Sequence, residues 1–261
     1  MDLSAWRAQR LADLTAADSW LSLVGLYWLE PGPQTLGSAN DNALVLPCGP
    51  AHWGVLHVNQ DGTVLWQAQG QAAVSLATDR DGKPDVVRHG DASFILIERD
   101  GQVALRLRDN AAPARLNFPG LDYFPEGDQW RIAARWEAAP QTLEIASMSG
   151  GLEARQVSGQ ALFRHGDKEY RLIPLDEDAQ GLFFVFADGT SGKKDGNGSY
   201  GAGRFLRADP PVDGRLVLDF NRAYNPPCAF TPFATCPLAP PENRLPFAVM
   251  AGEKYPLPQP L

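Results

Sequence analysis

The spacing of apolar and polar positions predicts one helix at the start of the chain. Residues 3 to 14 repeat apolar side chains at helical intervals, and Ser4 can cap the first turn. One face of this helix carries Leu3, Trp6, Arg10 and Leu14. The next segment, residues 18–29, is apolar and aromatic, and its periodicity does not decide between a buried helix and a strand.

From residue 33 onward the pattern changes to short apolar or alternating runs that are separated by turn residues. Asp-Gly pairs at 61–62, 81–82 and 100–101 predict hairpins, because the turn needs a positive φ that glycine supplies. The expected strands are 43–46, 53–58, 63–66, 73–76, 94–97, 103–107, 130–136, 142–146, 161–165, 170–173, 182–186, 201–206 and 215–220. This regular spacing is typical of a sandwich or a barrel.

Proline-rich stretches suggest how the chain is divided. Residues 109–125 contain three prolines and read as a connector, and the segment from residue 225 to the end is too rich in proline to be regular sheet throughout. We therefore predict a mostly β protein with an N-terminal helix and two sandwich-like or barrel-like subdomains. The predicted divisions are an N-terminal helical segment (1–32), a β-sandwich subdomain (33–108) and a larger β subdomain with a proline-rich C-terminal segment (109–261).

Charge and composition restrict the classes of partner. The 261 residues carry a formal net charge of −8 without a compensating basic cluster, so non-specific nucleic-acid binding is not expected. No apolar run has the length of a membrane-spanning helix, and the first residues, with an early acid at Asp2, do not read as a signal peptide. Three cysteines fit a reducing compartment. The sequence therefore predicts a cytoplasmic protein, and it leaves the oligomeric state open.

A short set of residues in the first half has the spacing of strands and turns that a known β-sandwich family shows. The set is Leu36-Gly37-Ser38, residues 42–47, His52 and Gly90-Asp91. It resembles a forkhead-associated domain, whose family binds phosphothreonine peptides. The arginine with which that family grips phosphate is Ser38 here, and no Ser-Arg-x-x-His run precedes His52. The resemblance therefore implies the fold for residues 33–108, and not the phosphate contact.

The C-terminal part carries a specific motif. Residues 201–206, 218–230 and 236–245, together with residues 25–29 and 251–254, resemble a bacterial and archaeal family that is catalogued as a domain of unknown function. The resemblance spans most of the chain and implies no established activity.

Seven polar side chains within this motif are candidates for a site. They are Arg204, Asp219, Asn221, Tyr224, Glu242, Asn243 and Arg244. Prolines stiffen the chain around them, and rigid placement of charged groups is how binding sites are often built. The functional hypothesis is a site for a small anionic metabolite in which Arg204 or Arg244 grips the anion and Asp219 or Glu242 does acid–base work. Asn221, Tyr224 and Asn243 would contact the ligand.

Two alternatives stay open beside that hypothesis. In the first, the segment is a structural clasp, with Asp219 and Glu242 as buried ion-pair partners of Arg204 and Arg244. In the second, the forkhead-associated-like half is a non-catalytic docking module. If the chain is an enzyme, the reaction that needs the fewest assumptions is metal-independent hydrolysis or isomerisation of a small anionic metabolite. No cofactor is expected.

Two further features are expected to be structural. Cys228 and Cys236 are too far apart in sequence for a usual zinc pair and have no histidine nearby in the chain, so we expect buried free thiols. A disulfide, a metal site and a catalytic cysteine–histidine pair stay open as alternatives. The glycine-rich stretch 188–200 lacks phosphate-loop spacing, so we expect a flexible hairpin loop, with a lid over a neighbouring pocket as the alternative.

Overall fold

The computed structural model describes residues 2–148, 150–193 and 196–256, and these divide into two compact units. The smaller unit comprises residues 13–118. The larger unit is discontinuous in sequence, because residues 2–12 belong to it together with residues 119–256. The predicted divisions at residues 32 and 108 stay a prediction.

The predicted N-terminal helix is confirmed as α1 (Leu3–Thr15). Its first turn is capped by Asp2, whose carboxylate accepts a hydrogen bond of 2.7 Å from the main-chain N–H of Ala5. This bond satisfies one of the donors that the first turn of a helix leaves without an intrahelical partner. Ser4, the predicted cap, lies one residue inside the helix, so that detail was wrong.

The smaller unit contains two sheets. The ambiguous segment 18–29 forms a 3₁₀ turn, η1 (Trp20–Ser22), and then strand β1 (Leu23–Trp28). One sheet has the order β1-β9-β8-β7 and the other the order β3-β2-β4-β5-β6. The other elements of this unit are β2 (Gly32–Gly37), β3 (Leu44–Val45), β4 (Gly54–Val58), β5 (Val64–Ala68), β6 (Val74–Leu76), η2 (Asp79–Asp81), β7 (Val86–His89), β8 (Ala92–Arg99), β9 (Gln102–Asp109) and α2 (Pro113–Leu116).

Strand β8 lies at the centre of the smaller unit's core. On one face of the strand, Phe94 is fully buried and meets Trp53 and Trp66 edge-on, with ring centroids 5.3 Å apart in both pairs. On the other face, Ile95 and Ile97 are also buried. A strand that is covered on both faces reads as a continuous apolar run in the sequence, as this one does.

The Asp-Gly pairs in the smaller unit differ in what they form. Asp100 and Gly101 both have positive φ, 52° and 75°, and close the hairpin between β8 and β9 as predicted. The pair at 81–82 does not close a hairpin, because Asp79–Asp81 form the 3₁₀ turn η2 and the chain then runs on to β7. Asp79 accepts a hydrogen bond of 2.9 Å from the N–H of Glu98 and forms an ion pair of 2.8 Å with Arg99, so contacts distant in sequence decide this turn.

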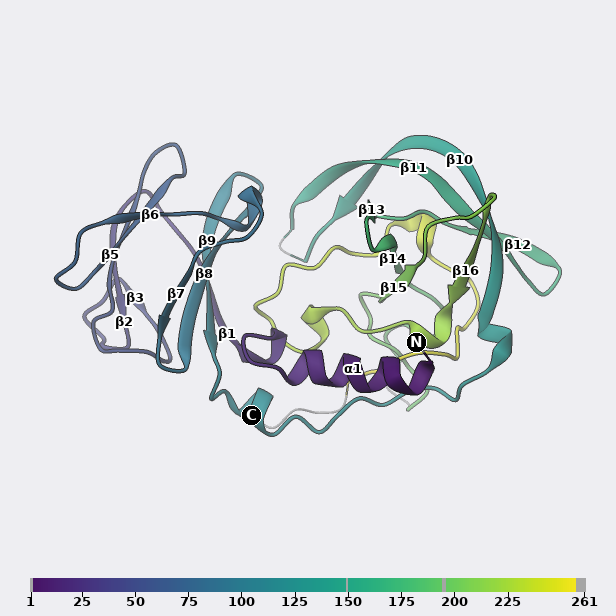
Figure 1. Cartoon of the computed structure of the whole chain (residues 1–261), viewed down its shortest axis with the longest axis horizontal. Helices are drawn as coiled ribbons and strands as arrows, with labels where there is room; N and C mark the ends of the chain where they lie inside the picture. Colours follow the sequence, from purple (N-terminus) through teal and green to yellow (C-terminus); the bar gives the residue numbers. More distant parts are fainter. Residues whose placement is uncertain (1, 149, 194–195, 257–261) are drawn as a thin grey trace. The chain divides into compact units, whose positions relative to one another are not determined.

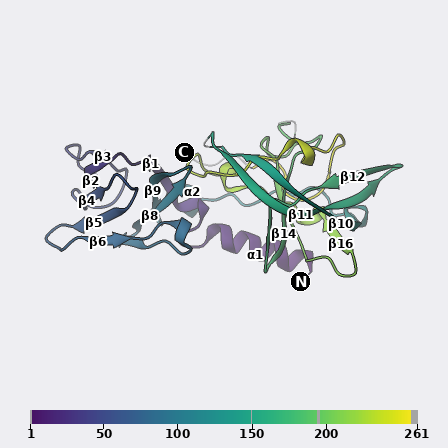
Figure 2. The same cartoon turned by 90° about the horizontal axis from the view of Figure 1, so that it is seen from above.

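The larger unit also contains two sheets, with the orders β12-β11-β10-β16 and β13-β14-β15. The predicted strands 130–136 and 142–146 are one long strand, β10, with a break in register between Ala138 and Gln141. Strands β10 and β11 form a long curved hairpin (Figure 1), whose twist is plain in Figure 2. The elements are η3 (Asp128–Trp130), β10 (Arg131–Ala146), β11 (Leu152–His165), β12 (Lys168–Leu172), β13 (Asp176–Asp178), β14 (Gly181–Phe186), β15 (Arg204–Ala208) and β16 (Arg215–Asp219).

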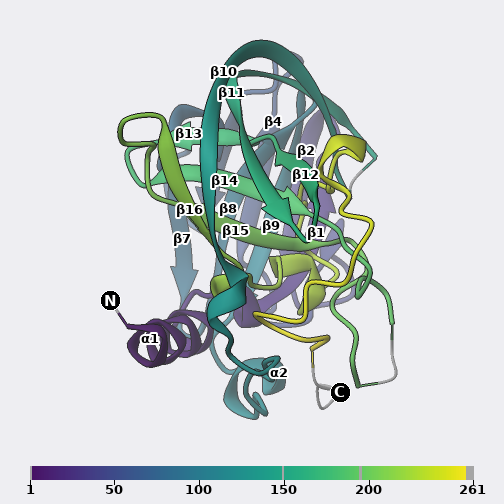
Figure 3. The same cartoon turned by 90° about the vertical axis from the view of Figure 1, so that its right-hand side faces the viewer.

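After β16 the chain is irregular, as the prolines predict. It contains three short 3₁₀ turns, η4 (Phe220–Arg222), η5 (Pro227–Ala229) and η6 (Pro241–Asn243), and it runs beside the sheets of the larger unit (Figure 3). The predicted class, mostly β with an N-terminal helix, is confirmed. Among the helices of the described residues, none combines the length and the apolar character that crossing a bilayer requires.

Candidate functional site

A short extended segment after η6 forms one wall of a cleft in the larger unit. The N–H of Ala187, just past β14, donates to the carbonyl of Asn243 at 3.2 Å, and the N–H of Leu245 donates to the carbonyl of Ala187 at 2.8 Å. Neighbouring side chains in an extended segment point to opposite sides. Asn243 and Leu245 are accordingly buried, and Arg244 between them is exposed.

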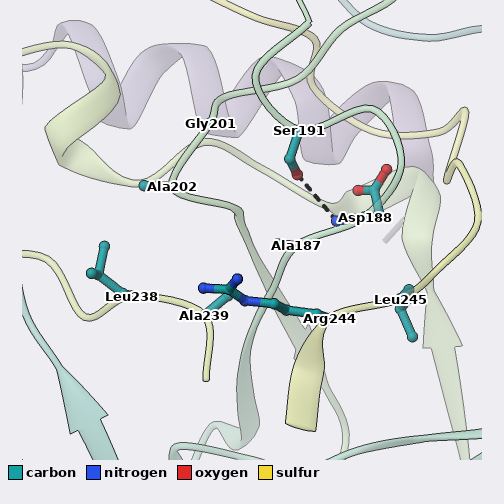
Figure 4. A pocket seen from close by; sticks show the side chains of 9 residues that line it. All are labelled: Ala187, Asp188, Ser191, Gly201, Ala202, Leu238, Ala239, Arg244 and Leu245. Atoms are coloured by element: carbon teal, nitrogen blue, oxygen red, sulfur yellow. Dashed lines mark hydrogen bonds between the residues drawn. The ribbon is translucent and has the colours of Figure 1, made fainter. Parts of the chain in front are cut away.

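The cleft has a volume of about 400 Å³ and a mixed lining (Figure 4). Most of its walls are small apolar groups, and its polar side chains come from three residues. The lining residues are Ala187, Asp188, Ser191, Gly201, Ala202, Leu238, Ala239, Arg244 and Leu245. They come from three separate stretches of chain, which β14, β15 and the C-terminal segment bring together.

Arg244 is the cleft's cationic group. Figure 4 shows its side chain stretched out toward Leu238 and Ala239. Within residues 2–148, 150–193 and 196–256 its guanidinium makes no hydrogen bond and no ion pair. A guanidinium group presents five N–H donors and matches carboxylate or phosphate in a two-point contact, so this side chain is available to an anion.

Asp188 also lines the cleft, but other groups of the protein occupy its carboxylate. One oxygen accepts hydrogen bonds from the N–H and hydroxyl of Thr190, both at 2.7 Å, and from the N–H of Val249 at 3.1 Å. The other oxygen pairs with Arg204 at 2.7 Å. Its main-chain N–H donates to the hydroxyl of Ser191 at 3.1 Å, the bond drawn in Figure 4. Asp188 therefore shapes the cleft wall.

Arg204 lies beneath this wall and has no exposed surface. Besides Asp188, its guanidinium donates to the carbonyls of Val249, Ala251 and Glu253. It also lies over the ring of Phe186, 5.3 Å from the ring centroid. Arg204 thus binds the last part of the chain to β15, and the structure does not bring it to the cleft.

The predicted ion pairs of the clasp hypothesis were wrong in their partners. Arg204 pairs with Asp188, which was not a candidate. Asp219 is 3.4 Å from Arg222, and its carboxylate accepts from the N–H of Asn221 at 3.2 Å, so it caps the turn η4. Glu242 is exposed on η6 and makes no ion pair with any described residue.

The amide candidates hold loops together. The side chain of Asn221 exchanges two hydrogen bonds with the main chain of Gly127, at 3.1 and 3.2 Å. Asn243 is fully buried and bonds the main chain of Ile173 twice, both at 2.8 Å, and the carbonyl of Val185 at 2.9 Å. Neither residue lines the cleft.

Tyr224 belongs to a second buried polar group, which joins the C-terminal segment to Arg10 of α1. The guanidinium of Arg10 lies 4.9 Å from the centroid of its ring and pairs at 2.9 Å with Glu253, which has no exposed surface. Glu253 also accepts from the N–H of Asn225 at 2.7 Å. Burial raises the pKa of Tyr224. Sequence reasoning missed the role of Glu253, although an arginine on the apolar face of the helix was a signal that Arg10 has a buried partner.

Of the seven candidates, only Arg244 lines the cleft. Sequence reasoning did not select Ser191, Ala202 or Leu238, which do. The signal for the first two was the glycine-rich loop between β14 and β15, which was read as a hairpin loop or a lid. Within that loop, Lys194 and Asp195 lie outside the described residues.

The comparison with known families identifies the larger unit's relatives. The profile of a family described as "Protein of unknown function (DUF1684)" matches residues 116–254, more than half of the chain. The chain belongs to this family. Every residue that lines the cleft lies inside the matched region. The match begins at residue 116, so the forkhead-associated resemblance of residues 33–108 stays a prediction.

A solved structure is similar to part of the chain. It is the solution NMR structure of an uncharacterised protein of Haloarcula marismortui, with 31% sequence identity and a TM-score of 0.43. The alignment covers 54% of this chain and 78% of that one. The sequence matches none of the curated proteins.

The cysteines of this DUF1684 member are not joined by disulfides in the structure, and their surroundings differ. The main-chain N–H of Cys228 donates to the sulfur of Cys236 at 3.2 Å. Hydrogen bonding from the Cys236 thiol lowers the pKa of the Cys228 thiol, and the Tyr200 hydroxyl acts in the same direction, although burial opposes both. In the smaller unit, burial raises the pKa of the Cys48 thiol to about 11. Among the described residues, no group of three or more histidine, cysteine or acidic side chains is placed to hold a metal ion.

The opposite pKa shifts of Cys228 and Cys48 predict the order in which these two thiols react. Because the thiolate is the reacting species, we expect iodoacetamide at pH 7.5 to alkylate Cys228 at least about tenfold faster than Cys48 in the folded protein. Timed quenching and tandem mass spectrometry of tryptic peptides measure both rates, and urea-unfolded protein is the control in which the rates converge. Equal rates in the folded protein would contradict the prediction.

Proposed function

We propose that the larger unit binds a small anionic molecule in the cleft lined by Arg244. The observation that carries this proposal is the exposed guanidinium of Arg244, which lines the cleft and has no hydrogen-bond or ion-pair partner among the described residues. Cationic side chains with a structural role are usually paired, as Arg204 and Arg10 are. An arginine that lines a cleft without a partner is suited to a ligand.

The size and the lining of the cleft support a small ligand with an apolar portion. A volume of about 400 Å³ lies in the lower part of the range for small-molecule sites, about 300–1,000 Å³. Leu238, Leu245 and the alanines offer contact to hydrocarbon, and the hydroxyl of Ser191 is a further polar group on the wall. A carboxylate or phosphate on a short carbon skeleton fits this lining.

Binding is a better-supported function than acid–base catalysis. The two predicted acid–base residues, Asp219 and Glu242, do not line the cleft, and protein groups occupy the carboxylate of Asp188. The proposal therefore assigns Arg244 the role of holding the anion and assigns no residue to a chemical step.

The test of the proposal is ligand-dependent thermal stability. A panel of small carboxylates and phosphates is screened against the wild-type protein. A compound that binds raises Tm by an amount that grows with the logarithm of its concentration over Kd. For any compound that binds, we expect Arg244→Ala to weaken its affinity roughly 10- to 100-fold, because the variant lacks one charge-assisted hydrogen-bonding contact. The fold should be unaffected, because the guanidinium makes no hydrogen bond or ion pair with the described residues.

The matched control is Arg215→Ala. Arg215 is exposed on β16 of the same unit and does not line the cleft, so its removal changes the net charge equally. The Arg215→Ala protein should bind the same compound with an affinity within about twofold of wild type. If the two variants lose affinity to the same extent, the effect is one of overall charge and the proposed site is wrong.

A further inference from the structure

The two motif cysteines face each other across a loop whose ends are fixed. Cys236 is held next to the end of β10, because the N–H of Met148 donates to its carbonyl at 2.9 Å. Cys228 lies in η5, and the hydroxyl of Tyr200 donates to its carbonyl at 2.9 Å. The bond of 3.2 Å from the N–H of Cys228 to the sulfur of Cys236 then joins the two ends directly.

The two cysteines differ in their exposure to solvent, so a dissolved reagent can reach one of them more easily than the other. Cys228 is half-buried and Cys236 is buried, and both pack against the same apolar cluster that includes Ala234 and Ala239. The bond from the Cys228 N–H places the sulfur of Cys236 next to the main chain of Cys228, within reach of its side chain. This is the arrangement of a reactive thiol beside a resolving thiol.

We infer that Cys228 and Cys236 form a reversible intramolecular disulfide, which makes the loop between them a site of oxidative modification. The inference rests on the placement of the two thiols and is independent of the proposed anion site. A metal ion is the less suited occupant, because the described residues add no third ligand to the two sulfurs.

The oxidant that we name is a peroxide. The Cys228 thiol is oxidised first: its sulfur takes one oxygen from hydrogen peroxide to become a sulfenic acid, and one water is released. The Cys236 sulfur then attacks the sulfenic sulfur, the S–S bond forms, and the hydroxyl leaves as a second water with the proton of the Cys236 thiol. Two thiols and one peroxide thus give one disulfide and two waters. A dithiol reductant reverses the step by thiol–disulfide exchange.

Tryptic mapping tests the inference on the full chain. No lysine or arginine lies between Arg222 and Arg244, so one peptide, residues 223–244, contains both cysteines. The folded protein is treated with a small excess of hydrogen peroxide, unfolded, alkylated with iodoacetamide and digested. We expect most of this peptide to be two hydrogen atoms lighter and without alkyl groups, while Cys48 takes the label. If the peroxide-treated protein is reduced with dithiothreitol before alkylation, the peptide should carry two alkyl groups again.

Three variants and one condition complete the test. Cys48→Ser should behave as wild type, whereas Cys228→Ser and Cys236→Ser should each leave one thiol and no light peptide. Pairing should be at least about tenfold slower in urea, because the fold holds the two sulfurs together. The inference is overturned if both cysteines stay alkylatable after peroxide, if the sulfenic acid goes on to sulfinic acid without pairing, if the bond joins two chains, or if the unfolded chain pairs as fast as the folded one.

Discussion

Replacing Asp188 with alanine is expected to lower the free energy of unfolding of the larger unit by about 3–5 kcal/mol. The change removes the anion of a fully buried ion pair and leaves the guanidinium of Arg204 in the protein interior without a counter-charge. It also leaves the main-chain N–H groups of Thr190 and Val249 without their acceptor. Each of these buried donors costs free energy when it is left without a hydrogen bond.

Denaturant unfolding measures the loss, and hydrogen exchange assigns it to the larger unit. The matched control is Asp178→Ala, which breaks an ion pair of 3.3 Å with Arg207 in the same unit, where both side chains are 37% exposed. An exposed pair contributes roughly 0–1 kcal/mol, so this control should change stability little. If both variants unfold at the same denaturant concentration, the buried pair does not hold the C-terminal segment.

The second large effect is expected at Asn243. Asn243→Ala should cost at least about 3 kcal/mol, because the amide makes three hydrogen bonds to the main chain of Ile173 and Val185 in a fully buried position. An alanine there leaves three buried main-chain groups without the partner that Asn243 supplies. Asn243 was a ligand-binding candidate in the sequence, and this expected result treats it as a structural residue.

The adjacent residue supplies the control. Glu242 is exposed, and its carboxylate makes no ion pair or hydrogen bond with the part of the chain that the structure describes, so Glu242→Ala should stay within about 0.5 kcal/mol of wild type. Both variants are compared by denaturant unfolding in the same buffer. An Asn243→Ala protein as stable as Glu242→Ala would show that water satisfies the three main-chain groups.

Local chemistry explains which parts of the fold could be predicted. The turn at Asp100 and Gly101 depends on two residues that accept positive φ, and a sequence shows that directly. The turn at 81–82 has the same two residue types but forms differently, because Asp79 bonds to Glu98 and Arg99 on another strand. The local sequence pattern does not reveal a pairing between residues that are this far apart in the chain.

The candidate site shows the same limit. The proline-rich motif located the right region, and Arg244 lines the cleft within it. The identity of Arg204's partner depends on the register of β14 and β15, in which Phe186 lies opposite Arg204 and Asp188 follows two residues later. A loop of 17 residues, from Ala187 to Gly203, separates these strands, and its length does not fix that register. The structural role of Asp188 could therefore not be read from the sequence.

The ion pair between Arg10 and Glu253 joins positions 243 residues apart in the chain. During synthesis on the ribosome, α1 is made well before its buried partner. Residues 13–118 are complete long before then, so the smaller unit can fold while the first helix still has no acceptor for Arg10. The helix must wait through the synthesis of the 242 residues between Arg10 and Glu253 before this ion pair can form, and during that interval the nascent chain is exposed to aggregation and to capture by chaperones.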